Sequence, residues 1–203
     1  MYIVYNILNG GTMNKGLLVV ISGPSGVGKG TIISKFINDP SLNIYYSISM
    51  TSRKPRKGEI DNVHYNFISK EQFKKYIQED KFLEWACFVD NYYGTPIDIV
   101  QQKLDQGINV ILEIEVEGAS IVKEKRPDCL TIFITPPSID DLKNRIEKRS
   151  TEAFDLIQQR LEKAKKELKQ MHNYKYVVCN DDPFLAADII KLIIQRSSKS
   201  KLI

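Results

Sequence analysis

The chain of 203 residues is poor in the residues that build disulfides and metal centres, with three cysteines and two histidines. Cys87, Cys129 and Cys179 have no C-x-x-C spacing and are odd in number, which favours reduced thiols in an intracellular compartment over a disulfide framework. His64 and His172 have no metal-ligand spacing and no neighbouring nucleophile to activate. We therefore interpret both histidines as surface or packing residues.

Long apolar runs are absent too. No segment approaches the roughly 20 residues needed to cross a bilayer, and the N-terminal extension, residues 1–12, has no basic residue and lacks the pattern of a secretory signal. Met13 offers an alternative start. The net charge of +4 is too small to indicate a nucleic-acid partner but suits a pocket that receives anions. We expect a cytoplasmic monomer that binds neither nucleic acid nor membrane.

Four apolar, β-branched runs indicate strands buried on both faces of a sheet. They cover residues 17–22, 109–115, 129–136 and 174–180. Apolar residues at helical spacing follow the first run over residues 31–39, and a final helix is expected at about Phe184 to Gln195. Strands separated by helical stretches predict an α/β fold, a parallel core sheet flanked by helices with right-handed connections.

Two segments interrupt this alternation. Residues 48–98 are polar and aromatic and indicate an inserted subdomain with short antiparallel strands. Residues 138–173 are helical and highly charged, and most of their lysines fit a solvated surface with i,i+4 ion pairs. The boundaries that we expect are a core of residues 13–47, 99–138 and 162–203, an insertion of residues 48–98, and a helical lid of residues 139–161.

The stretch GPSGVGKGT, residues 23–31, matches the pattern G-x-x-x-x-G-K between a strand and a helix. The glycines let successive backbone N–H groups point inward at a helix N-terminus, and Lys29 adds a positive charge for the outer phosphates. This context favours a phosphate-binding loop of the P-loop NTPase type over a simple glycine turn. The predicted ATP-binding residues of the loop are Gly23, Ser25, Gly26, Val27, Gly28, Lys29, Gly30 and Thr31.

Gly30 stands where a hydroxyl group usually contacts Mg²⁺, and the hydroxyl comes one residue later, at Thr31. The ending GKGT resembles nucleoside monophosphate kinases, and the chain has no NKxD motif of a GTPase. Because Mg²⁺ tolerates being held mainly by phosphates and water, we expect it to arrive with ATP. Glu113, after an apolar run, could hold a metal-bound water or could be structural; both interpretations stay open.

The insertion carries two further motifs, SISMTSRKPRKGEIDNVHYNF and FLEWACFVDNYYGTP. From about Leu17 to Asp182 the chain closely resembles the guanylate kinases, whose pattern here is S-x-T-T-R-x-P-R-x-G-E-x-x-G-x-D-Y-x-F followed by F-x-E-W-A and N-Y-Y-G. The resemblance implies Mg²⁺-dependent transfer of the γ-phosphoryl group of ATP to GMP. We expect dGMP to be accepted as well, since the sequence offers no obvious way to reject a deoxy sugar.

The chemistry of the matched residues agrees with a GMP acceptor. Arg53 and Arg56 can form bidentate bonds to one phosphate, and Tyr65 and Tyr93 add hydroxyl donors. Glu84 can accept hydrogen bonds from both N1–H and the 2-amino group of guanine, whereas adenine would turn a lone pair toward it. This pattern disfavours AMP.

Other roles come from the resemblance alone. Ser49 and Thr95 would contact the O6 side of guanine, and Glu115 would replace an aspartate that helps to read the base. Asn180 would lie by the adenine of ATP, although an asparagine after a strand is also a common turn residue. Phosphoryl transfer needs positioning and charge neutralisation more than a base. The predicted catalytic cations are Lys29, Arg53, Arg145, Arg149 and Arg160.

The chain departs from the family pattern at several positions. LEIEVEG replaces LDIDxQG, so that Glu113 and Glu115 are each one methylene longer than aspartate. Asn62 and Ser150 replace glycines and His64 replaces an aspartate; Ser150 could stiffen a hinge that has to move. The longer glutamates could alter base selectivity, whereas the changes at Asn62, His64 and Ser150 bear on rate more than on identity.

Two alternatives remain. Guanylate-kinase-like scaffold domains share the resemblance but bind phosphorylated proteins after losing much of the ATP loop. The intact loop with Lys29 and the lid arginines argue against that interpretation. The second alternative is a kinase of the same class that prefers dGMP or another base.

Overall fold

The computed structural model describes residues 15–149 and 154–200. The predictions made for the N-terminal extension, for Met13 and for Ser150 lie outside the described residues. Five strands form a central sheet in the order β2-β7-β1-β8-β9, and every neighbouring pair is parallel. The strands are β1 (Leu18–Ser22), β2 (Ile44–Tyr46), β7 (Asn109–Glu113), β8 (Leu130–Thr135) and β9 (Tyr176–Cys179). The predicted α/β class with a parallel core sheet is confirmed.

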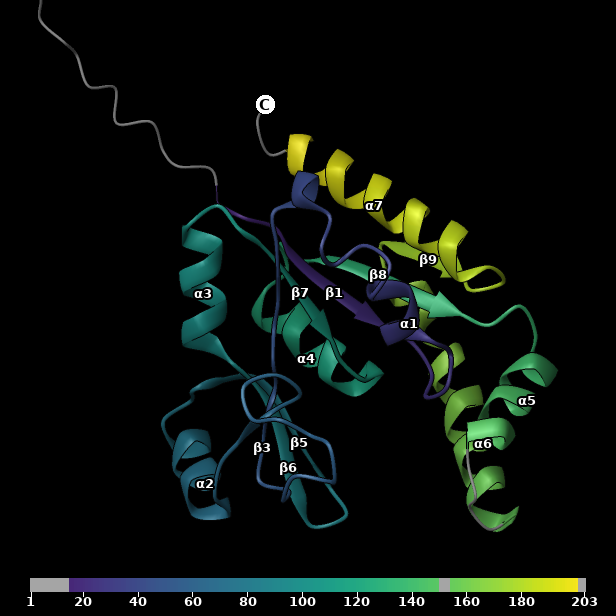
Figure 1. Cartoon of the computed structure of the whole chain (residues 1–203), viewed down its shortest axis with the longest axis horizontal. Helices are drawn as coiled ribbons and strands as arrows, with labels where there is room; N and C mark the ends of the chain where they lie inside the picture. The colour runs from purple at the N-terminus through teal and green to yellow at the C-terminus, as the bar shows by residue number, and fades with distance from the viewer. Residues whose placement is uncertain (1–14, 150–153, 201–203) are drawn as a thin grey trace, which may run out of the picture.

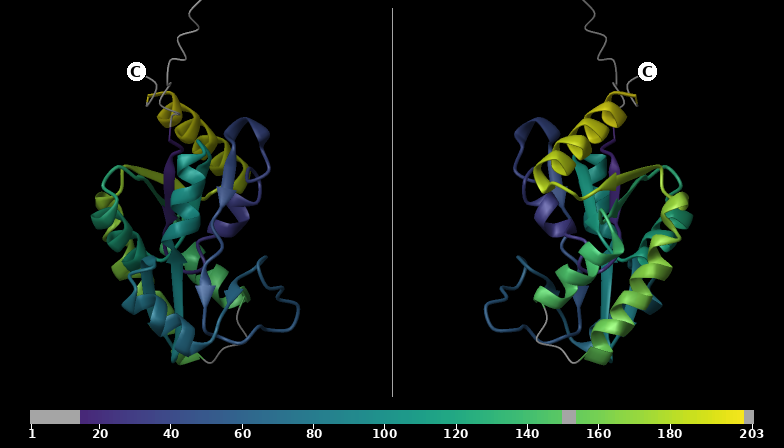
Figure 2. Two further views of the ribbon diagram at one scale, coloured as in Figure 1. Left: turned by 90° about the vertical axis from the view of Figure 1, so that its left-hand side faces the viewer. Right: turned by 90° about the vertical axis from the view of Figure 1, so that its right-hand side faces the viewer.

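Strand β1 lies in the middle of the sheet, and all of its side chains are buried. Leu18 and Val20 pack into a core with α3 (Ile97–Asp105) and α4 (Val116–Lys125). Val19 and Ile21 pack on the opposite face of the sheet, with α1 and α7. Those two helices span Lys29–Ile33 and Pro183–Ser200. Figures 1 and 2 show the sheet enclosed between these two layers of helices.

A second sheet is built from the segment between β2 and β7, with strand order β4-β3-β6-β5. Its strands are β3 (Met50–Thr51), β4 (Asn66–Phe67), β5 (Phe82–Phe88) and β6 (Asn91–Pro96). The expectation of antiparallel strands is correct for β3–β6 and β5–β6 but wrong for β3–β4, which are parallel. The loop of residues 52–65 carries the chain back, so that β4 starts beside β3 in the same direction.

Helix α2 (Lys70–Gln78) covers this small sheet. Phe73 is fully buried and its ring stacks on Phe82 at 4.4 Å and on Tyr92 at 5.4 Å between ring centroids. Ser69 accepts a hydrogen bond from Gln72 N–H and so caps the helix. The small sheet therefore has its own aromatic core.

Two helices, α5 (Ile139–Arg149) and α6 (Phe154–Leu168), account for the charged segment. The predicted end of the lid at residue 161 falls inside α6, which continues unbroken to Leu168. In Figure 1 the small sheet and these helices lie on the side of the molecule toward which the arrowhead of β1 points. The carboxyl ends of parallel core strands are where α/β proteins bind ligands. Among the residues described, no helix is long and apolar enough to span a membrane.

Local structure differs from the sequence patterns in three places. The helix expected over residues 31–39 ends at Ile33, because Lys35 and Phe36 donate to carbonyls three residues back, at 3.0 Å each. Strand β2 has only three residues, of which Ile44 and Tyr45 are partly buried and Tyr46 is exposed, so the sequence shows no long buried run there. Helix α7 is longer than predicted at both ends.

Candidate active site

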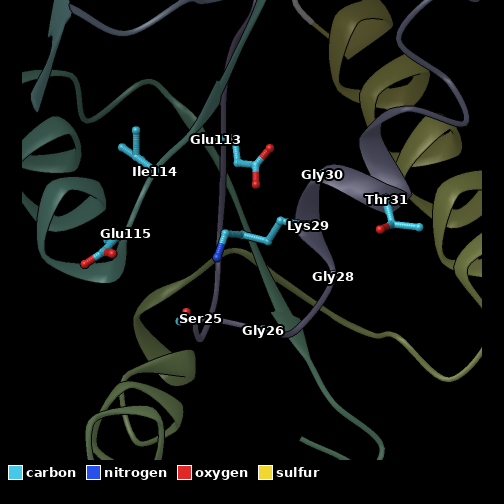
Figure 3. A pocket seen from close by; sticks show the side chains of 9 residues that line it. All are labelled: Ser25, Gly26, Gly28, Lys29, Gly30, Thr31, Glu113, Ile114 and Glu115. Atoms are coloured by element: carbon cyan, nitrogen blue, oxygen red, sulfur yellow. The ribbon is translucent and has the colours of Figure 1, made fainter. Parts of the chain in front are cut away.

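The loop between β1 and α1 is shaped by glycines. Gly26 and Gly28 have φ angles of 85° and 98°, in the left-handed region that side chains disfavour. Loop residues line a cavity of about 460 Å³, shown in Figure 3. They are Ser25, Gly26, Gly28, Lys29, Gly30 and Thr31. The carboxyl end of β7 supplies the facing wall with Glu113, Ile114 and Glu115.

Lys29 extends back along the loop. Its Nζ donates to the carbonyl of Gly23 at 2.7 Å and to that of Pro24 at 3.3 Å. Burial lowers the pKa of Lys29, and the nearby carboxylate of Glu113 opposes that shift. The ammonium group is thus held in the loop by carbonyl dipoles, which are weaker partners than a charged oxygen would be.

Val27 and Asn180 join the loop to the last core strand. Asn180 Nδ2 donates to the Val27 carbonyl at 2.7 Å, and Arg145 donates to the same carbonyl at 3.2 Å and to the Asn180 carbonyl at 2.9 Å. The buried Asn180 Oδ1 has no hydrogen-bond partner within the described part of the chain. Asn180 therefore fixes the loop backbone through its amide nitrogen, while its buried amide oxygen is left without a partner among the described residues.

Helix α6 contacts the loop through Arg160, whose Nη2 lies 3.0 Å from Ser25 Oγ. Arg149 is the last residue of α5, and its side chain lies outside the described residues. Two of the three predicted lid arginines, Arg145 and Arg160, are therefore already at the phosphate loop.

The position of Glu113 fits a magnesium ion carried by a nucleotide. A Cβ atom at Gly30 would lie 3.5 Å from Glu113 Oε2, an ordinary van der Waals distance, so the position that lacks the hydroxyl directly faces this carboxylate. Tyr46 donates to Glu113 Oε2 at 2.9 Å. Thr31 points away from the Lys29 ammonium group (Figure 3). No group of three acidic, histidine or cysteine side chains within the described ranges could hold a metal ion unaided.

A second cavity of about 320 Å³ lies between the small sheet and the end of β7. Five of the predicted GMP-binding residues line it: Ser49, Tyr65, Glu84, Tyr93 and Glu115. Thr95 is 1% exposed and donates its hydroxyl to Glu84 Oε1 at 2.6 Å, so in this structure it orients Glu84 from behind. Burial raises the pKa of Glu84, and hydrogen bonds from Thr95 oppose that shift.

Gly118, in the first turns of α4, gives Glu84 its room. A Cβ atom added there would lie 2.8 Å from Glu84 Oε2. We expect Gly118→Ala to displace the carboxylate and to raise the KM for GMP about 10-fold, equivalent to about 1.4 kcal/mol, with the KM for ATP unchanged. Steady-state kinetics with each substrate varied in turn measures this.

The matched control for Gly118→Ala is Ile121→Ala on the exposed side of the same helix. Alanine favours a helix over glycine by roughly 0.5–1 kcal/mol, so the melting temperature of Gly118→Ala should not fall. An unchanged KM for GMP would show that Glu84 tolerates the displacement.

Arg53 is held by a carboxylate that the sequence analysis did not single out. Its guanidinium forms a bidentate pair with Glu59 at 2.8 and 2.9 Å, and Glu59 also accepts from Arg56 N–H at 2.7 Å. The Arg53 pair lowers the pKa of Glu59 to about 2. Arg56 itself is exposed on the loop and does not line the cavity.

The aromatic side chains connect this pair to the cavity. The Arg53 guanidinium lies 5.4 Å from the centroid of the Tyr65 ring, and Tyr65 meets Tyr93 edge to face at 6.0 Å. The signal that could have found Glu59 is its place in RKPRKGE, three residues after the second arginine. A carboxylate there can preorganise the arginine fork.

The two cavities share a wall, because Glu113, Ile114 and Glu115 line both of them. On one side of this wall lies a phosphate loop. On the other lies a carboxylate-lined pocket with tyrosines and a nearby arginine. Together they define a P-loop phosphotransferase with two adjacent nucleotide-sized sites.

Comparisons with known proteins identify the family within this class. The family model "Guanylate kinase" matches residues 15–196. A guanylate kinase of Latilactobacillus sakei subsp. sakei (strain 23K) is 50% identical over 182 residues, 90% of each chain. The crystal structure of guanylate kinase from Anaplasma phagocytophilum has a TM-score of 0.72 at 30% identity, covering 91% of this chain and 87% of that one.

The chain belongs to the guanylate kinase family. The family's known reaction is ATP-dependent phosphorylation of GMP, and the chain is accordingly a nucleoside monophosphate kinase, a phosphotransferase.

Proposed function

We propose that this kinase binds ATP in the larger cavity and GMP in the smaller one, and that the γ-phosphoryl group crosses between them over the shared wall. An oxygen of the GMP phosphate forms the new bond to the γ-phosphorus while the bond to the β,γ-bridging oxygen breaks, giving GDP and ADP. The observation that carries the proposal is the wall of Glu113, Ile114 and Glu115, which belongs to both cavities. Adjacent sites let the two nucleotides meet without a covalent enzyme intermediate.

On the acceptor side, Glu84 reads the N1–H and 2-amino edge of guanine, with Thr95 holding its other oxygen. Glu115 contributes a second carboxylate to the base, and Ser49 lines the same cavity. The GMP phosphate lies toward Arg53 and Arg56. Tyr65 and Tyr93 hold it through their hydroxyl groups, since both line the cavity next to Arg53.

On the donor side, the loop amides hold the ATP phosphates and Lys29 neutralises the charge that develops at the transferring group. Arg145 and Arg160 join it from the lid side, as does Arg149. Asn180 holds the loop through Val27 and lies toward the adenine. Mg²⁺ bound with ATP would neutralise negative charge on the phosphates, with Glu113 holding one of its waters.

We further propose that the lid, residues 139–161, and the insertion, residues 48–98, close over the core and exclude water, so that phosphate reaches GMP rather than hydrolysing. We propose dGMP as an alternative acceptor. A monomer is the proposed working unit, because one chain lines both cavities. All three cysteines are free, which suits the reducing cytoplasm that we propose as its location.

A coupled assay of ADP formation tests the substrate assignment, with ATP and Mg²⁺ and each of GMP, dGMP, AMP, CMP and UMP. We expect GMP to be the preferred acceptor, dGMP to be used, and AMP to be poor because Glu84 would face its N1 lone pair. Preference for another base would mean that Glu84 and Glu115 are wrongly assigned. GMP binding without any turnover would favour a binding module.

A further inference from the structure

Lys163 on α6 reaches the carboxylate at the start of α4. Its Nζ lies 2.7 Å from Glu115 Oε2 and 3.8 Å from Glu167 Oε1, one turn further along α6. The side chains of Lys163 and Glu115 are 43% and 67% exposed. Ion pairs as exposed as this contribute little to folding stability. The consequence of the contact therefore lies in what it does to Glu115.

Glu115 stands in an acidic cavity. Four carboxylates line the acceptor cavity, from Glu84, Glu113, Glu115 and Glu117, and none of the described residues that line it is a lysine or an arginine. A nucleoside monophosphate brings negative charge of its own, so unpaired carboxylates here oppose its entry. Lys163 neutralises one of the four without occupying the cavity, since it is not among the lining residues.

The contact also leaves Glu115 able to accept hydrogen bonds. Lys163 takes Oε2, so that Oε1 keeps its lone pairs for an N–H donor on a base. Glutamate has one more rotatable bond than the aspartate of the family pattern, so an unpaired Glu115 would spread over more rotamers. A cation fixed on one oxygen restricts that spread.

Helix α6 is well placed to hold this cation. Arg160, one turn before Lys163 on the same helix, contacts Ser25 of the phosphate loop. Glu167, one turn after it, is 8% exposed, and its Oε1 lies 3.8 Å from the same ammonium group. One helix thus contacts both cavities, and the ammonium group of Lys163 lies within 4 Å of two carboxylates although its side chain is partly exposed.

We propose that Lys163 is a positioning residue that orients Glu115 toward the 2-amino group of the acceptor base. The proposal rests on the acceptor assignment given above. Lys163 acts through Glu115 and touches neither nucleotide. Its effect should therefore appear in the affinity for GMP and in discrimination against IMP, which lacks the 2-amino group, and not in the chemical step.

The test uses the full chain with Lys163→Met, the conservative Lys163→Arg, and Lys166→Met as a matched control on an exposed part of α6. We expect Lys163→Met to raise the KM for GMP roughly 5- to 10-fold, with kcat and the KM for ATP little changed. The preference for GMP over IMP should narrow. Lys163→Arg should restore most of the affinity for GMP and most of the preference for GMP over IMP. Lys166→Met should behave as the unmodified chain.

A double-mutant cycle with Glu115→Gln separates positioning from a general effect. If Lys163 acts through Glu115, adding Lys163→Met to Glu115→Gln should change the KM for GMP by less than about twofold. An unchanged KM and GMP/IMP ratio in Lys163→Met would overturn the inference while leaving the kinase assignment intact. The inference would also be overturned if Lys163→Met raised the KM for GMP as much in the Glu115→Gln variant as in the unmodified chain. A fall in kcat that is equal for GMP and IMP would overturn it too. If the unmodified chain turns over no GMP, the acceptor assignment itself fails, and the inference with it.

Discussion

Lys29→Ala is expected to lower kcat for GMP phosphorylation by about 10²–10³-fold. Lys29 Nζ is bound by the Gly23 and Pro24 carbonyls, and its side chain lies in the cavity opposite Glu113 and Glu115 (Figure 3). Phosphoryl transfer depends on positive charge placed before the reaction begins. Alanine leaves the loop backbone in place but removes that charge, so the loss should fall mainly on kcat and less on the KM for ATP.

The folded state should survive this change. Because burial lowers the pKa of Lys29, its ammonium form is less favourable in the folded protein than in water, and losing it should not lower the melting temperature. Coupled assays and thermal unfolding of Lys29→Ala and of the exposed control Lys166→Ala measure both effects. A decrease in kcat of about tenfold or less would mean that the loop amides and arginines suffice without Lys29.

The sequence identifies the loop because everything needed is local. Five consecutive buried residues precede it in β1, the pattern G-x-x-x-x-G-K follows, and Gly26 and Gly28 have the positive φ angles that the pattern implies. Glu84 could be assigned for a similar reason, since it lies in a motif and its chemistry matches one edge of guanine. Residue type and short spacing suffice for predictions of this kind, and the structure places Glu84 in the smaller cavity.

Contacts between distant segments could not be predicted in the same way. Arg145 donates to the carbonyl of Val27, 118 residues away, and Lys163 pairs with Glu115, 48 residues away. In the sequence, Lys163 is one of many lysines alternating with glutamates on a charged helix. Which of them leaves the solvated face depends on how α6 lies against the core. That arrangement is a tertiary property, fixed by apolar contacts such as those of Ile157 and Leu161.

The sequence patterns did not predict two short features, the strand β2 and the early end of α1, because tertiary packing stabilises them. Strand β2 is stabilised by its pairing with β7 rather than by a buried run of its own, and α1 ends early because the turns after Ile33 bring Phe36 into the core. In both cases packing overrides local propensity. The parallel β3–β4 pair likewise depends on a returning loop that no local pattern encodes.

Glu84→Gln is expected to lower kcat/KM for GMP by about 10³-fold or more, because an amide N–H₂ would then face the N–H donors of guanine. The KM for ATP should stay unchanged. A glutamine can donate to a ring nitrogen and accept from an amino group, so the preference for GMP over AMP should narrow as well. Competition assays with the two acceptors measure this ratio.

The same substitution should stabilise the fold at neutral pH. Burial raises the pKa of Glu84, so the folded protein binds this proton more tightly than the unfolded chain does. The stability linked to Glu84 is therefore fully present below the ordinary carboxyl pKa and is lost as the pH rises through the raised value. Glu84→Gln, always neutral, should melt higher than the unmodified chain at pH 7, by about 2–4 °C for each kcal/mol recovered, and the gap should close in acid.

The pH dependence of GMP binding should run the other way. The unmodified enzyme needs Glu84 ionised. As the pH is lowered, its affinity for GMP should therefore begin to fall while the pH is still above the range in which an ordinary carboxyl group is protonated. The weak GMP binding by Glu84→Gln should not change over the same pH range. Glu124→Gln, an exposed position on α4, should reproduce the unmodified enzyme in binding and in melting. Normal GMP binding by Glu84→Gln would contradict the proposal that an ionised Glu84 reads the base. A melting temperature of Glu84→Gln at pH 7 that does not exceed that of the unmodified chain would contradict a buried, ionised Glu84. In the latter case the ionised carboxylate at this position would not lower the stability of the fold.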